Sequence, residues 1–147
     1  MKKLITLLCL CSFISYSQTI TVDSNTYSAS DLANLLVTNS CINPTNISYS
    51  SGESVAYFNK NGSAFPINQG VIIRNGIAQN SAGIYTGNNL SSQVNTNSDV
   101  DLQNISNSSG QSSTITDAAF LQFDFIPISN NFNFNFLFAS NEYGEFQ

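Results

Sequence analysis

The feature that most constrains this chain is the spacing of phenylalanines in its last third. From Phe132 to Phe138 a phenylalanine occupies every second position, and asparagine fills two of the three positions between them. Successive side chains of a β-strand point to opposite faces of a sheet, so this period of two predicts a strand with one apolar face. The segment from Leu121 to Phe125 repeats the pattern one strand earlier, and residues 127–131 have the composition of a hairpin loop.

The rest of the chain favours a mainly β fold in one domain. Its 147 residues leave room for one domain of ordinary size, and only 9% of them are charged. Strong helix formers are scarce, whereas Asn, Ser and Thr are abundant. We predict an antiparallel β-sandwich, incomplete at its C-terminal end, with further strands at residues 18–23, 42–49, 54–58, 65–67 and 70–74. The pairs Asn61-Gly62 and Asn75-Gly76 predict turns between them.

One short N-terminal helix is expected. Ser28 or Ser30 is suited to cap its start, and an acid at Asp31 suits the positive end of a helix. The leucines of residues 32–36 lie on one face of the turns that follow, and the helix is expected to end near Asn39. The sequence indicates no other substantial helix.

The N-terminus has the pattern of a secretory signal peptide. Two lysines precede an apolar run, residues 4–14, which is shorter than the roughly 20 residues that a membrane span needs. Ser15 and Ser17 supply the small residues that favour cleavage before Gln18. The predicted divisions are a signal peptide, residues 1–17, and a β domain, residues 18–147. We therefore expect a secreted protein without membrane insertion.

Charge and residue types exclude several classes of function. Removal of Lys2 and Lys3 lowers the formal charge from −5 to −7 and leaves Lys60 and Arg74 as the cationic side chains. Binding to nucleic acid or to an anionic membrane needs more cations than that. Histidine is absent, which excludes Ser-His-Asp and Cys-His nucleophiles and His-rich zinc sites. Cys41 is left as the single cysteine, and we expect it to be a small buried thiol.

Acidic residues in the second half of the chain suggest a calcium site. Residues 79–110 read as a long polar loop, in which Asp99 and Asp101 place carboxylates at alternate positions. Calcium favours several oxygen ligands, so we predict a site held by these two residues together with Asp117 or a nearby carbonyl, although the spacing is not that of an EF-hand. The alternative is that these acids are hydrated loop residues or caps.

A second set of candidate residues lies near the end of the chain. Glu142 and Glu145 form a pair of carboxylates such as a glycoside hydrolase uses, and Tyr143 is an aromatic ring able to stack on a sugar. No other catalytic feature accompanies them. These three residues are therefore predicted as ligand or interaction residues, with packing of the aromatic ring as the alternative.

These segments together resemble the choice-of-anchor L domain family. The matching parts run from about Tyr27 to the end: the helix before Cys41, the segment Gly70 to Gly76, Asp99 to Leu102, Asp117 to Pro127, and Phe134 to Phe146 with its FASNEYGEF block. The resemblance implies an extracellular bacterial module, of Bacteroidetes type, in large proteins with variable C-terminal anchors and no established enzymatic activity. Asn141 departs from the family, which usually has a second acid there, and the family continues beyond the last residue of this chain.

The sequence thus predicts a secreted or cell-surface structural or adhesive module without catalytic activity. Its expected partners are an extracellular glycan or protein surface and the downstream domains of a longer chain, whose C-terminal region would supply any anchor. The alternative is a carbohydrate-binding domain or a fragment of a glycan-active enzyme. Because the strand from Phe132 to Ala139 would lack its partner, the stretch alone is expected to be marginally stable or prone to aggregation.

Overall fold

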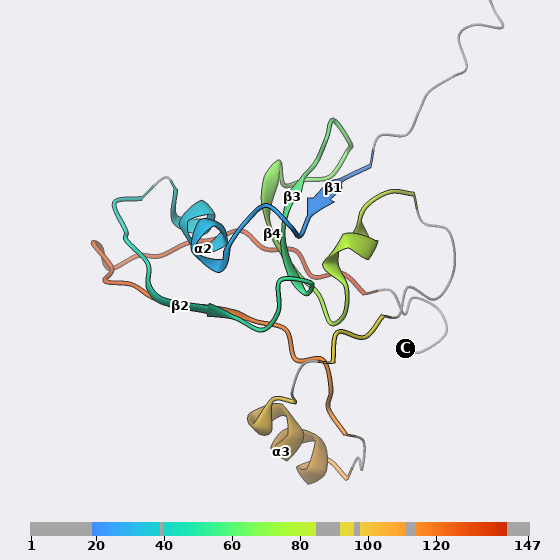
Figure 1. Ribbon diagram of the computed structural model, residues 1–147. Helices are drawn as coiled ribbons and strands as arrows, with labels where there is room; N and C mark the ends of the chain where they lie inside the picture. The colour runs from blue at the N-terminus through green and yellow to red at the C-terminus, as the bar shows by residue number, and fades with distance from the viewer. Residues whose placement is uncertain (1–18, 39, 85–91, 96–97, 111–113, 141–147) are drawn as a thin grey trace, which may run out of the picture.

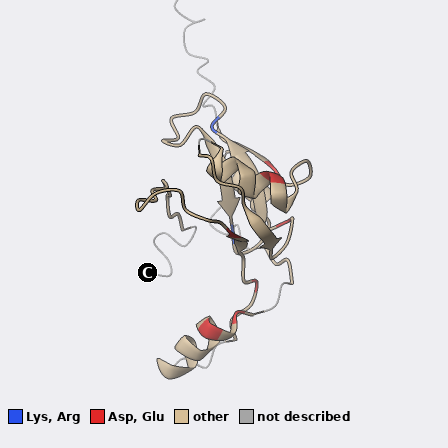
Figure 2. Ribbon diagram, turned by 90° about the vertical axis from the view of Figure 1, so that its left-hand side faces the viewer, with Lys and Arg blue, Asp and Glu red and all other residues tan. Residues whose placement is uncertain are grey.

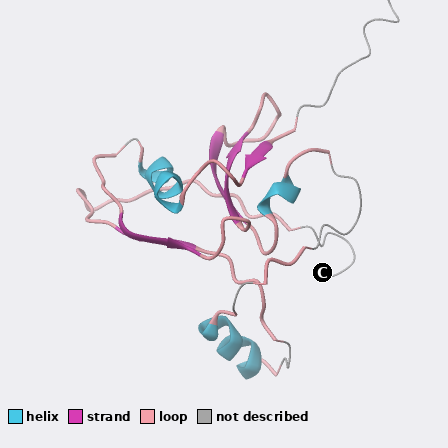
Figure 3. Ribbon diagram, viewed as in Figure 1, coloured by secondary structure: helices cyan, strands magenta, loops and turns pink. Residues whose placement is uncertain are grey.

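The computed structural model describes residues 19–38, 40–84, 92–95, 98–110 and 114–140, and these form a mainly β domain. Two antiparallel sheets make up the fold, as predicted (Figure 1). The first sheet has the order β1 (Thr21–Asp23), β3 (Val55–Asn59), β4 (Gln69–Ile73). The second pairs β2 (Thr45–Tyr49) with β5 (Leu121–Asp124). The arrangement is consistent with a small β-sandwich-like domain in which long loops connect short strands (Figure 3).

Helix α2 (Ala29–Val37) lies between the two sheets. It contacts β4 of the first sheet and both strands of the second. The sequence predicted a cap at Ser28 or Ser30, and the structure has Ser28 as the N-cap of a capping box. The Asp31 N–H donates to Ser28 Oγ over 3.2 Å, and the Ser28 N–H donates to the Asp31 carboxylate over 2.9 Å. Leu32 and Ala33 are fully buried on the inner face of the helix. Burial of this face joins the two sheets into one body.

The main apolar cluster covers one face of the first sheet. Val22, Ala56, Phe58 and Ala78 are its buried members, and Ala78 begins the short 3₁₀ helix η2 (Ala78–Ser81). Side chains alternate between the two faces along β3, so Tyr57 lies on the opposite face of the sheet from Phe58. There its ring stacks on that of Tyr27, with the ring centroids 4.6 Å apart. The sheet is therefore covered on both faces, by η2 and its neighbours on one side and by the start of α2 on the other.

Three of the predicted elements differ in the structure. Residues 65–67 do not form a strand, and β4 begins only at Gln69. A second nine-residue helix, α3 (Val100–Ser108), occupies part of the expected polar loop and extends away from the sheets (Figure 1). Asp99 caps it, but its many Asn and Ser residues have low helix propensity and conceal it in the sequence. The third difference concerns the phenylalanine segment.

The run from Phe132 to Ala139 is not a strand, so the predicted second arm of the hairpin is wrong in the structure. The chain bends at residues 128–130, and the rings of Phe125 and Phe132 come within 5.0 Å of each other. However, β5 forms its ladder with β2, and residues 131–140 have no strand partner among the residues described. Alternation of side chains is a property of the sequence, whereas a strand also requires a neighbour with which to exchange hydrogen bonds.

The capping box makes α2 sensitive to acid. Hydrogen bonds from the Ser28 hydroxyl and then the Ser28 N–H lower the pKa of Asp31 below its ordinary value of 3.8. A carboxyl with a lowered pKa stabilises the fold above its unfolded pKa, and this contribution is lost as the pH falls through the folded pKa. We therefore expect Asp31→Ala to lower the melting temperature at neutral pH but to match the parent in strong acid. Melting curves between about pH 7 and about pH 2 test this, and a constant difference across that range would contradict it.

Candidate functional site

The most distinctive surface of the molecule is a row of exposed phenylalanines. We define the Phe strip as Phe132, Phe134, Phe136 and Phe138, whose side chains are 50%, 64%, 79% and 86% exposed. Consecutive rings lie 6.1 Å and 6.2 Å apart along the first three members. That spacing is close to the roughly 6.6 Å between side chains two residues apart in an extended chain. The strip is thus a single row of rings on an extended, uncovered backbone.

Strand β5 fixes the root of the strip. Its alternation is as predicted: Leu121, Phe123 and Phe125 are half-buried, while the side chains between them are exposed. The ring centroids of Phe123 and Phe125 lie 6.0 Å apart and those of Phe125 and Phe132 lie 5.0 Å apart, so the ring row begins on the half-buried face of β5. At the end of β5 the Asn46 amide donates to the Asp124 carboxylate over 2.6 Å. The pairing with β2 is irregular between Thr45 and Ser48, where Asn46 has a φ of 50°.

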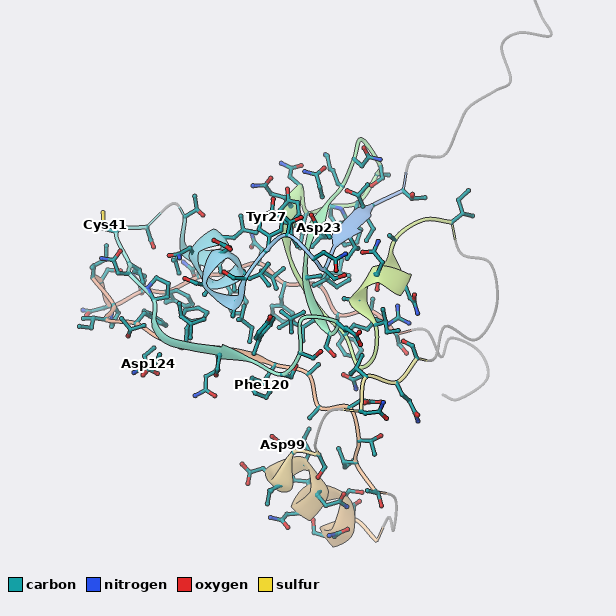
Figure 4. All side chains as sticks on the ribbon, viewed as in Figure 1. Asp23, Tyr27, Cys41, Asp99, Phe120 and Asp124 are labelled. Carbon is teal, nitrogen blue, oxygen red and sulfur yellow. The ribbon has the colours of Figure 1, made fainter. Side chains whose placement is uncertain are left out.

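A shallow groove of about 320 Å³ lies beside the root of the strip. Cys41, Asn43 and Thr45 line one side of it, and Ile126 and Ile128 line the other. Cys41 is exposed, so the expectation of a buried thiol is wrong, because the chain after α2 runs along the surface before it enters β2 (Figure 4). The two sides of the groove are more than 80 positions apart in the sequence, from Thr45 to Ile126. They lie together because β2 pairs with β5, a pairing that the spacing of residues along the chain did not reveal.

The strip and its surroundings carry no charge. Residues 125–140 contain no Asp, Glu, Lys or Arg. In Figure 2 the segments coloured for Lys, Arg, Asp and Glu are few along the described ribbon. The carboxylate that precedes this segment, that of Asp124, is already hydrogen-bonded to Asn46. Residues 125–140 therefore offer apolar contacts and neutral hydrogen bonds, and no side chain for an ion pair.

The structure places the predicted calcium ligands in different roles. Asp99 is the N-cap of α3, where its Oδ1 accepts from the Leu102 N–H over 2.9 Å, and Asp101 follows in the first turn. Asp117 is buried, has a φ of 54° and accepts from the Val94 N–H over 3.2 Å. In the described part of the chain, no three His, Cys, Asp or Glu side chains gather where they could hold a metal ion. Figure 4 shows Asp99 on α3, apart from the labelled acids of the sheets.

Calcium binding by Asp99, Asp101 and Asp117 stays a prediction, and the cap gives a way to test it. Asn caps a helix about as well as Asp, whereas Ala costs about 1 kcal/mol of helix stability. We expect Asp99→Ala to speed amide exchange in α3 and Asp99→Asn to leave it unchanged, without calcium. A calcium site would instead raise the melting temperature of the parent in millimolar calcium relative to chelator, and Asp99→Asn would abolish that rise. An unchanged exchange rate in Asp99→Ala would contradict the capping role.

The other predicted site residues, Glu142, Tyr143 and Glu145, lie outside the residues that the structure describes. The carboxylate pair of the glycosidase alternative is therefore not placed. Among the described residues, the apolar row and the groove are the surfaces that stand out. The row was evident from the period of two in the sequence, and the groove was not.

Comparison with protein families supports the resemblance noted from the motifs. The choice-of-anchor L domain matches residues 21–147 of the chain. Comparison with curated proteins and with solved structures gives no match. Within the described ranges, no helix has the length and apolar content needed to cross a bilayer. The match extends over both sheets, α2, α3 and the Phe strip, and by it the chain belongs to the choice-of-anchor L domain family.

Proposed function

We propose that this domain is a non-catalytic adhesive module that attaches to its partner through the Phe strip. The family indicates a cell-surface or extracellular module and is not a known enzyme family. The observation that carries the adhesive role is the exposure of four phenylalanines in one uncharged row. A contiguous apolar surface of this kind on a folded domain marks an interaction site.

The chemistry of the row suits short-range attachment. Phenylalanine offers a large contact area and loses little conformational entropy when it is held, because its side chain has only two rotatable bonds. Asn133 and Asn135, between the rings, are exposed and supply amide donors and acceptors. Without charges in residues 125–140 there is no electrostatic steering, so association is governed by shape and desolvation.

Retention on coated surfaces tests this role. Beads that carry the secreted chain are passed over surfaces coated with an extracellular polysaccharide or with an extracellular protein. We expect the double variant Phe134→Asn/Phe136→Asn to lose most of the retention. The matched control is Ile84→Asn, which removes a 73% exposed apolar side chain outside the strip. Equal retention of the double variant and the parent would contradict the proposal.

Carbohydrate binding is the second candidate, because exposed rings flanked by amides are also able to stack on and hydrogen-bond to a sugar. It is favoured if retention is confined to the polysaccharide and soluble oligosaccharide competes for it. An enzymatic version also requires the release of reducing ends, which Glu142→Gln and Glu145→Gln would abolish. We expect no release from the parent.

Export is a further part of the proposal. The predicted signal peptide, residues 1–17, lies outside the described residues, and β1 begins shortly after it at Thr21. We expect secretion with cleavage before Gln18, because Ser15 and Ser17 fit the small positions of a cleavage site. N-terminal sequencing of the secreted protein measures this. A mature protein that still begins at Met1 would contradict it.

A further inference from the structure

We propose that Asn61 is a site of spontaneous covalent modification, at which the pair Asn61-Gly62 closes to a succinimide and reopens as aspartate or isoaspartate. The reaction needs water and no enzyme. The chain contains two Asn-Gly pairs, Asn61-Gly62 and Asn75-Gly76, and their surroundings in the fold direct the reaction to the first of them. The site is independent of the adhesive role proposed above, because neither pair lies in the Phe strip.

The reaction joins a backbone nitrogen to the side chain that precedes it. The nitrogen of Gly62 gives its proton to solvent and bonds to Cγ of Asn61, while the side-chain nitrogen takes a proton from solvent and leaves as ammonia. Water then opens the ring. Cleavage between Cγ and the nitrogen gives aspartate, and cleavage between the backbone carbonyl carbon and the nitrogen gives isoaspartate. Glycine in the second position favours closure, because it has no side chain to obstruct the approach.

The first pair forms the tip of an exposed turn. Asn61 and Gly62 are both exposed, and both have a positive φ, 47° and 72°, like the central residues of a type I′ turn. The Ser63 N–H donates to the Lys60 carbonyl across the turn over 2.8 Å. In Figure 1 the connection between β3 and β4 projects beyond the end of the sheet. A loop tip of this kind opens locally at little cost in free energy, which lets the side chain and the backbone reach the geometry of ring closure.

The second pair is held in place by its neighbours. Gly76 is buried, and a Cβ added there would lie 2.3 Å from the Ser92 carbonyl oxygen, so the backbone of Gly76 packs directly against Ser92. The next residue is fixed to the same neighbour, because the Ile77 N–H donates to Ser92 Oγ over 2.8 Å. Ring closure requires rotation about the backbone bonds between Asn75 and Gly76, and that rotation would disrupt both contacts. The fold therefore protects the second pair and leaves the first one reactive.

Modification changes the turn in two ways. Asn61 Nδ2 donates to the Thr19 carbonyl over 3.4 Å, and Thr19 lies two residues before the start of β1. The carboxylate of the product cannot donate, so this link to the chain before β1 is lost. Each modified copy also gains one negative charge, which makes the product separable from the parent by ion exchange.

Peptide mass spectrometry of the secreted chain, after incubation in mildly alkaline buffer, tests the site. We expect aspartate and isoaspartate at Asn61 in several times the yield found at Asn75. Both pairs follow a basic residue, Lys60 or Arg74, so their local sequences are alike and Asn75 is an internal control. In denaturant the two pairs should react at similar rates, because the protection of the second pair is then removed.

Asn61→Gln is the matched variant. Glutamine keeps the amide but would have to form a larger ring, which closes far more slowly, so most of the gain in negative charge seen with the folded parent should disappear. A yield at Asn61 of the folded parent no greater than that at Asn75 would overturn the proposal. The same excess at Asn61 in denaturant would also overturn it, because the local sequence rather than the fold would then set the rate. An undiminished gain in charge in Asn61→Gln would overturn it as well, since the reacting residue would then lie elsewhere.

Discussion

Replacing Gly76 with alanine is expected to cost about 3 kcal/mol or more of the free energy of unfolding. Gly76 has a φ of +112°, a conformation that residues with a Cβ rarely adopt. An added Cβ would lie 2.3 Å from the Ser92 carbonyl oxygen and 2.6 Å from its Oγ. That hydroxyl accepts the Ile77 N–H over 2.8 Å, so Ser92 cannot move aside without breaking a hydrogen bond. Both backbone strain and overlap therefore oppose the substitution.

Gly83→Ala separates the two causes. Gly83 also has a positive φ, +83°, but a Cβ there would meet nothing within 4 Å. Its cost should be limited to the backbone term, about 1 kcal/mol. Denaturant unfolding of both variants measures the difference, which reports the contact between Gly76 and Ser92. Equal losses at the two glycines would show that the contact does not restrict the turn.

The second large effect is expected at Leu32, which is fully buried on the inner face of α2. Leu32→Ala should cost about 2–5 kcal/mol, because it removes buried methyl groups and leaves a cavity that the neighbouring side chains fill only in part. The helix lies between the two sheets, so the cavity weakens the contact that joins them. The midpoint of chemical unfolding should fall accordingly.

Leu36→Ala is the control for this substitution. It makes the same chemical change on the same helix at a side chain that is 43% exposed, so it should cost well under half as much. Unfolding midpoints of the two variants are compared with that of the parent. Similar losses would mean that helix propensity, rather than burial, sets the effect.

Much of the fold could be predicted because its signals are local. The capping box at Ser28 and Asp31 needs only four residues, and the alternation at Leu121 to Phe125 needs only five. Helix α3 was missed because its composition is that of a loop, although Asp99 directly before an apolar residue is a recognisable cap. The pairing of the Phe strip was mispredicted because a strand depends on a neighbour, and no local pattern identifies which neighbour is present.

The candidate site also has one part that the sequence could predict and one part that depends on the fold. The Phe strip was visible as a period of two, and its lack of charge could be counted directly. The groove between Cys41 and Ile128 depends on which strands pair, so spacing along the chain could not predict it. The three aspartates looked alike in sequence, but two of those carboxylates accept backbone N–H groups in separate parts of the structure. The function of an acid depends on its surroundings, which the fold determines.

The irregular register of β2 has a consequence for the edge of its sheet. Between Thr45 and Ser48 the ladder is interrupted, and Asn46 adopts a left-handed conformation. A strand twisted in this way is a poor template, because an incoming chain cannot keep its hydrogen bonds in step along it. Among the described strands, the edge of β2 that does not pair with β5 is thereby protected against edge-to-edge pairing with another chain.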